Sequence, residues 1–172
     1  MASPDLLGVA ALYVCAALVI VAFFLMGKVG AKETAAMALW TGIICFLIGA
    51  YDGFVEKNPA NLGAFLLFAY TYFYLFFNIM TGATEQPGLG WYCLFVVLAC
   101  IPFIYVTGIF GMYLMCFLWI LWAYLWGLFW LLLALRKPII KLTVASLFIG
   151  AAIIGVCGVG FMFGWLTPYG VA

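Results

Sequence analysis

The stretch that decides the fold is FLWILWAYLWGLFW, Phe117 to Trp130, in which every residue except one glycine is apolar or aromatic. It lies inside a longer run, Met112 to Leu135, that contains no charged residue. About 20 apolar residues in a helix cross the hydrocarbon core of a bilayer. The run therefore predicts a transmembrane helix.

Five further runs have the same character, and together the six occupy nearly all of the 172 residues. Hydrophobic residues make up 71% of the chain, more than a soluble domain of this length could bury. A closed β-barrel would need alternating polar and apolar residues, whereas these runs are apolar at odd and even positions alike. The sequence predicts an all-α membrane protein with a single six-helix transmembrane domain over residues 1–172. The five further runs are Leu6 to Met26, Thr34 to Val55, Asn61 to Thr81, Trp91 to Gly108, and Ile139 to Trp165.

The connections between the runs are short, about ten residues or fewer, so neighbouring helices should pack as antiparallel hairpins. Asn61 is expected to cap the third helix. Gly160 and Gly164 are expected to form a small-residue face that allows close helix packing.

The distribution of basic residues predicts the orientation in the membrane. The loop after the first run carries Lys28 and Lys32, and the connection after the fifth carries Arg136 and Lys137 with Lys141 just beyond. These loops should face the cytoplasm. Both termini would then lie outside a bacterial inner membrane.

Several classes of function are poorly supported by the ionisable residues. The chain has six Lys and Arg, five Asp and Glu and no His, and the middles of the runs are uncharged. Coupled transport usually needs an intramembrane acid or base, and catalysis needs paired or activated groups. The six cysteines form no CxxC pair and have no His partner, so neither a metal nor another cofactor is expected. We predict that the chain is not an enzyme.

Aromatic residues supply the remaining signal. Trp119, Trp122, Trp126 and Trp130 recur at spacings of three, four and four, which places them on one stripe of a helix. Phe68 and Tyr72, four residues apart, share a face of the third helix. Packing of large rings is the commoner reason for such stripes, and a pore lining is the other interpretation. Ring walls would suit a thin, planar, uncharged solute.

Several stretches carry a resemblance beyond this periodicity. They are LYVCAALVIVAFFLMGKVGAKETAAM from Leu12 to Met37, LLFAYTYFYLFFN from Leu66 to Asn78, WYCLFVVLACIP from Trp91 to Pro102, LWGLFW from Leu125 to Trp130, and PIIKLT from Pro138 to Thr143. In order and spacing they resemble the AmiS/UreI family of urea and short-chain amide channels. The resemblance implies a protomer with its own pore, assembled into a homohexameric ring in membrane lipids.

The resemblance also implies positions for the pore residues. Phe68 and Tyr72 match an aromatic pair of the third helix, and Trp126 and Trp130 match tryptophans of the fifth. A further family tryptophan falls on Ala123, for which Trp122 could substitute. Acid-gated relatives carry a glutamate in the last helix, whereas this chain has Gly150 or Ile154 there, depending on the alignment. The remaining expected pore residues are Phe129, where leucine is usual, Leu18 and Ala11.

The sequence thus predicts passive flow of urea or a small neutral amide through a narrow aromatic filter. Acid-gated relatives resemble pH switches that use histidines in their outer loops. Because this chain has no His, we expect conduction to change little between pH 5 and 8. Two alternatives remain: a non-transporting scaffold subunit of a larger complex, and a coupled exporter of aromatic or cationic compounds, since tryptophan cages can hold cations. The exporter is disfavoured by the lack of an intramembrane carboxylate. No nucleic-acid partner is expected.

Overall fold

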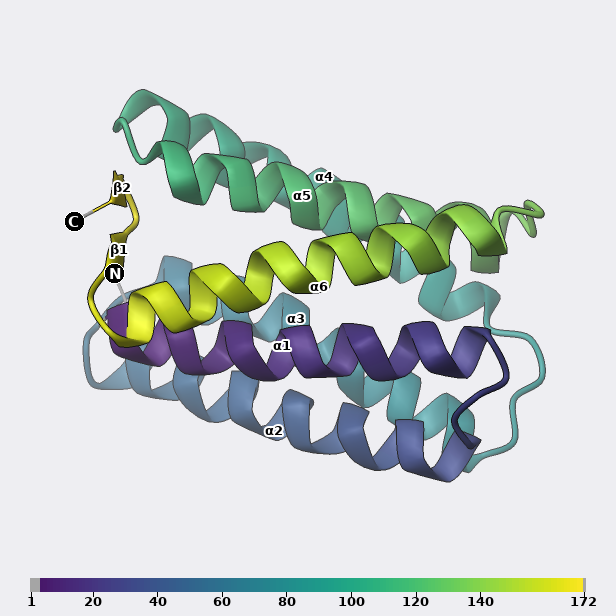
Figure 1. Ribbon diagram of the computed structural model, residues 1–172. Helices are drawn as coiled ribbons and strands as arrows, with labels where there is room; N and C mark the ends of the chain where they lie inside the picture. The colour runs from purple at the N-terminus through teal and green to yellow at the C-terminus, as the bar shows by residue number, and fades with distance from the viewer. Residues whose placement is uncertain (1–3, 172) are drawn as a thin grey trace.

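The computed structural model describes residues 4–171, which form six long helices and a short C-terminal β-hairpin. All six helices are long and apolar enough to cross a membrane. Figure 1 shows them running side by side as one bundle, with both ends of the chain at the same end of it. The all-α six-span prediction is confirmed. The elements are α1 (Pro4–Leu25), α2 (Ala31–Phe54), α3 (Pro59–Met80), α4 (Pro87–Ile109), α5 (Tyr113–Phe129), a π-helical turn η1 (Trp130–Ala134), α6 (Ile140–Met162), β1 (Leu166–Thr167) and β2 (Gly170–Val171).

Helix boundaries differ from the predicted runs where the chain has local start and stop signals. The helix α4 begins at Pro87, four residues before the predicted Trp91, because proline suits the first helical position. The helix α6 ends at Met162, before the predicted Trp165. Gly164, which has φ +70°, caps this end of the helix: its backbone N–H donates to the Phe161 carbonyl oxygen. This left-handed position costs glycine little.

The turn between α2 and α3 corrects one sequence expectation. Asn58, not Asn61, is the N-cap of α3, and its side-chain oxygen accepts the backbone N–H of Asn61 at 3.1 Å. The Asn61 side chain instead donates to Asp52 at the end of α2, over 3.0 Å. Because Pro59 already occupies the first helical position, the cap falls on the residue before it.

Helix pairing follows the chain only in part. The helices α2 and α3 pack as a hairpin, as do α4 and α5, whereas α1 packs most extensively on α6 (Figure 1). Gly8 and Gly158 allow this close crossing: a Cβ on Gly8 would lie 2.6 Å from the Gly158 carbonyl oxygen. The expected Gly160–Gly164 face is not formed, since Gly164 lies beyond the helix and Gly160 packs on Leu166.

The C-terminal hairpin closes over the end of the bundle where the chain begins. The strands β1 and β2 pair antiparallel, with Leu166 opposite Val171. Between them, the Pro168 carbonyl oxygen accepts the backbone N–H of Met115 in the first turn of α5, over 3.2 Å. Such short strands give little sequence signal, and tertiary contact holds them in place.

Candidate functional site

Two cavities lie inside the bundle. The wide cavity has a volume of about 250 Å³ and lies in the half that holds the start of α1 and the β-hairpin. The narrow cavity, about 100 Å³, lies in the opposite half, around the ends of α1, α3 and α5. The helices α1, α3, α4 and α5 contribute side chains to both.

Three residues line both cavities and therefore mark a waist between them: Val14 of α1, Phe68 of α3 and Trp122 of α5. The rings of Phe68 and Trp122 meet edge to face, with centroids 5.0 Å apart and planes 81° apart. All three side chains are buried. The cavities thus follow one another along the bundle, with a narrow aromatic constriction between them.

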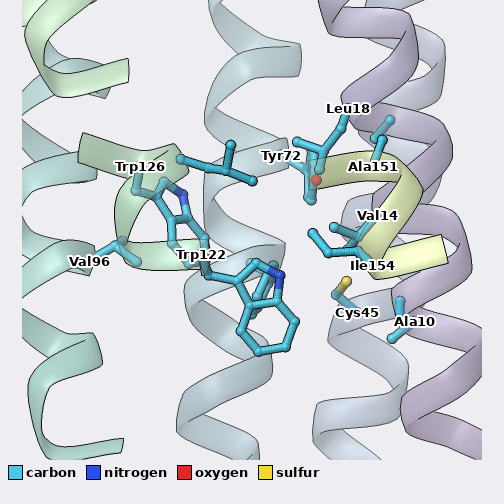
Figure 2. Close-up of a cluster of buried hydrophobic side chains, with 14 of the residues drawn as sticks. Ala10, Val14, Leu18, Cys45, Tyr72, Val96, Trp122, Trp126, Ala151 and Ile154 are labelled. Carbon is cyan, nitrogen blue, oxygen red and sulfur yellow. The ribbon is translucent and has the colours of Figure 1, made fainter. Parts of the chain in front are cut away.

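Further rings support the waist from both sides. Trp126 lies 4.7 Å from Phe68 between ring centroids, and Trp119 lies 5.0 Å from Trp122. Phe103 of α4 stacks on Trp119, with the two ring planes 14° apart. Figure 2 shows Trp122 and Trp126 on one side of this region, with Val14, Leu18 and Tyr72 on the other. The stripe on α5 therefore faces the interior of the bundle.

The structure brings seven of the eight expected pore residues to the two cavities. Phe68 and Trp122 line both, and Ala11 lines the wide one. Trp130 is the exception among the described residues: it starts the π-helical turn and packs near Trp91, with ring centroids 6.4 Å apart. The expected residues that line only the narrow cavity are Leu18, Tyr72, Trp126 and Phe129.

Other lining residues were missed by the sequence analysis. Val14 lies on the same face of α1 as Ala11 and Leu18, so helical spacing could have found it. Asn58 and Asn61, at the start of α3, line the wide cavity, and only their polarity inside an apolar chain could have singled them out. The lining from α4, which includes Phe103 and Cys93, carried no such signal.

The electrostatic character of the cavities is neutral. Among the side chains of residues 6–171, no Asp, Glu, Lys or Arg lines either of them. The Trp122 indole N–H is buried and has no hydrogen-bond partner among the described residues. The Tyr72 hydroxyl likewise makes no hydrogen bond within that part of the chain and is available to the narrow cavity. This lining offers hydrogen bonds to a polar solute and no counter-charge to an ion.

Two solved structures from Helicobacter pylori have the same fold. The crystal structure of the urea channel from Helicobacter pylori superposes with a TM-score of 0.79 at 23% identity, covering 93% of this chain and 99% of that one. The structure of the Helicobacter pylori urea channel in its closed state gives a TM-score of 0.74 at 24% identity, with 93% and 100% covered. At this identity the likeness establishes the shared fold.

Two bacterial relatives are similar in sequence. A Rhodococcus erythropolis protein named as the transporter protein AmiS2 is 27% identical over 136 residues, which is 73% of this chain. A Mycolicibacterium smegmatis protein named as a transporter of amidate substrates is 28% identical over 141 residues, or 74% of this chain. The matched segments cover 63% and 62% of these relatives, so the chain spans less than two thirds of their length.

A family-wide comparison covers almost all of the bundle. The description of the AmiS/UreI family transporter matches residues 6–163, from α1 to the end of α6. The family is one of transporters, which confirms the prediction that the chain is not an enzyme. The six membrane-spanning helices and the resemblance seen in the sequence agree with this match, and the chain belongs to the AmiS/UreI family of transporters.

Proposed function

We propose that this protein is a passive channel for urea or small neutral amides. The observation that carries the proposal is the pair of uncharged cavities that meet at Val14, Phe68 and Trp122. A hydrated ion would lose its water there without gaining a counter-charge. A flat neutral solute could instead exchange water for single hydrogen bonds while lying against ring faces. The urea-channel fold and the amidate-transporter name of one relative support this solute class.

The proposed filter consists of Phe68, Trp122 and Trp126 at the waist, with Tyr72 and Phe129 beside the narrow cavity. Leu18 and Ala11 complete the apolar wall. We propose that Trp130, which lies near Trp91 and lines neither cavity, supports the helix end and does not touch the solute. Ring size and spacing would then set the selectivity, without tight binding.

Flux through reconstituted vesicles tests this function. Proteoliposomes are challenged with urea, formamide, acetamide, butyramide and glycerol, and solute permeability is followed by stopped-flow light scattering. We expect urea and the short amides to cross faster than in protein-free vesicles, and glycerol to cross more slowly than the amides. If the protein is instead a non-transporting scaffold subunit, the permeability of the vesicles to all five solutes should equal that of protein-free vesicles.

Variants of the filter test the proposed residues. We expect Trp126→Ala and Tyr72→Ala to change the ratio of urea to butyramide permeability, because each removes a ring from the cavity wall. Trp130→Ala removes the same ring as Trp126→Ala from a position outside both cavities, and should leave the ratio unchanged. Equal ratios in all three variants and the parent chain would reject the proposed filter.

A further inference from the structure

The connection between α3 and α4 (residues 81–86) crosses one end of the bundle. Figure 1 shows it at the end opposite the β-hairpin. It is the covalent link between two packed hairpins, α2–α3 and α4–α5. The narrow cavity lies between these hairpins, with Tyr72 of α3 on one side and Trp126 of α5 on the other (Figure 2). The connection therefore limits how far the two sides of the cavity can separate at this end.

Gln86 is the residue of this connection that lines the narrow cavity. Every other described residue in the lining of that cavity lies in a helix. The lining also includes Leu25, the last residue of α1, and Leu133 of η1, so the cavity extends to the same end of the bundle. A solute that leaves the narrow cavity at this end must pass the half-buried Gln86 side chain.

A hydrogen bond holds the Gln86 side chain across this end. Asn78, in the last turn of α3, donates its side-chain N–H to the Gln86 side-chain oxygen over 3.3 Å. This distance is at the long end of the range for hydrogen bonds, so the bond is easily broken. A second side-chain hydrogen bond between α3 and α4, from the Tyr92 hydroxyl to the Leu67 carbonyl oxygen, lies further inside the bundle. The Asn78–Gln86 bond thus joins the two sides where the cavity ends.

The α4 side of this bond is fixed, whereas the connection before it is loosely held. A Cβ on Gly90 would lie 2.5 Å from the backbone nitrogen of Ala134, so the start of α4 packs directly on η1. Glu85 pairs with Arg136 in the connection after η1. The backbone N–H groups of residues 84–86 donate to no backbone oxygen within the described residues. A segment with so few backbone hydrogen bonds is displaced at low cost.

We propose that Gln86 is a gate at this end of the pore and that Asn78 is its latch. While the Asn78–Gln86 bond is made, the Gln86 side chain stays in the cavity wall and closes the exit. When the bond breaks, the side chain and the loosely held connection move aside and the exit widens. The latched form is the one in the structure, so we take it as the predominant state. The gate rests on the proposed function, because it controls a pore.

A gate and a filter change transport in different ways. A gate changes the fraction of channels that are open, so it multiplies the permeability of every solute by the same factor. A filter changes the permeability of one solute relative to another. The latch should therefore change urea and butyramide permeability together, without changing their ratio.

Stopped-flow flux of urea and butyramide through proteoliposomes tests the latch, with permeability expressed per reconstituted channel. Asn78→Ala should raise both permeabilities about fivefold, the factor that one ordinary hydrogen bond supplies. Asn78→Asp keeps a partner for Gln86, because its carboxylate accepts the amide N–H of Gln86. Both permeabilities should then stay at or below the parent value. Loss of folded protein can only lower the flux, and a leak would change the ratio of the two solutes.

Tyr92→Phe is the matched control. It removes the other hydrogen bond between α3 and α4, at a residue that lines neither cavity. Both permeabilities should keep the parent value, because the latch is intact. A general loosening of α3 from α4 would instead raise them in this variant as well.

The outcomes separate the two proposals. A parent chain whose urea permeability equals that of protein-free vesicles rejects the proposed function. Urea flux through the parent, together with unchanged or lowered permeability in Asn78→Ala, rejects the gate alone. A rise in Asn78→Ala that changes the ratio of urea to butyramide also rejects it, since Asn78 would then act on selectivity. An equal rise in the Tyr92 control rejects it too.

Discussion

Trp122 and Trp130 both carry a buried indole N–H that meets no acceptor within the described residues. Of the two, only Trp122 lines the cavities: it lies eight residues before Trp130, at the waist, while Trp130 begins the π-helical turn. A buried donor without a partner costs free energy of folding, about 1–3 kcal/mol in mutational series. The Trp122 N–H has almost no accessible surface in this structure, so a solute would meet it only when the waist widens to let the solute pass.

Replacing each of these tryptophans with phenylalanine separates stability from transport. We expect Trp122→Phe to keep or raise the thermal unfolding midpoint, because it deletes an unpaired donor, and to lower urea permeability about fivefold. Trp130→Phe deletes the same N–H outside both cavities and should leave permeability unchanged. Thermal unfolding in detergent and stopped-flow flux measure the two quantities. Equal loss of flux in both variants would contradict the assignment of the donor to Trp122.

Among the elements, the crossing of α1 and α6 is one of the tight helix contacts that the glycines reveal. A Cβ on Gly8 would meet the Gly158 carbonyl oxygen at 2.6 Å and the Met162 backbone nitrogen at 2.8 Å. Both are backbone atoms, so they cannot turn aside as a flexible side chain could. Close backbone approach through small residues is a common way for membrane helices to associate.

The close contact between α1 and α6 predicts that a larger side chain at Gly8 destabilises the protein. Gly8→Val should lower the free energy of unfolding by about 1–3 kcal/mol, because it forces α1 and α6 apart. Gly63→Ala is the matched control: its Cβ would meet no heavy atom within 4 Å, so helix propensity should leave the protein as stable or slightly more stable. Thermal unfolding in detergent compares them. A Gly8→Val variant as stable as the parent would show that the crossing can relax.

The number of helices could be predicted from the sequence, but the faces they present could not. Apolar length is a local property, and each run from Leu6 to Trp165 gave a helix. The helices are apolar on all sides, however, so no polar stripe marks which face meets a cavity. Ala11 and Leu18 were expected through the family resemblance, while Val14 between them was missed.

Other differences arise from tertiary contacts. Trp130 was expected in the filter, but the chain leaves the regular helix there, and the Leu135 N–H bonds the carbonyl five residues back. Asn61 was expected to cap α3, yet the cap falls on Asn58 and Asn61 turns to Asp52. The change at Trp130 has no strong local signature, whereas Pro59 directly after Asn58 was a local signal for the cap that the sequence analysis did not use.

At the scale of the whole molecule, the neutral lining predicts how transport responds to pH. The sequence has no His, and among the side chains of residues 6–171 no Asp, Glu, Lys or Arg lines either cavity. We therefore expect urea permeability to change less than twofold between pH 5 and 8, since no group with a pKa in that range meets the solute. Stopped-flow flux at four pH values measures this. A steep activation on acidification would require a switch outside the cavity walls.

The charge distribution predicts how the bundle is oriented. Four basic residues lie at the end of the bundle opposite the β-hairpin: Lys28, Arg136 and Lys137 in connections, and Lys32 in the first turn of α2. Arg136 pairs there with Glu85. The positive-inside rule places that end in the cytoplasm and both termini outside. Alkaline phosphatase, active only outside, should work when fused after residue 172 and fail when fused after Lys137. The reverse pattern would invert the proposed orientation.

The β-hairpin has a practical consequence for anyone handling this protein. Pro168 lines the wide cavity, and its carbonyl oxygen is anchored to α5. The β-hairpin therefore forms part of the wall of the wide cavity. An affinity tag or fluorescent protein fused after residue 172 would lie beside this cavity. Slowed permeation through a tagged preparation would reflect that obstruction, and cleaving the tag should restore the rate.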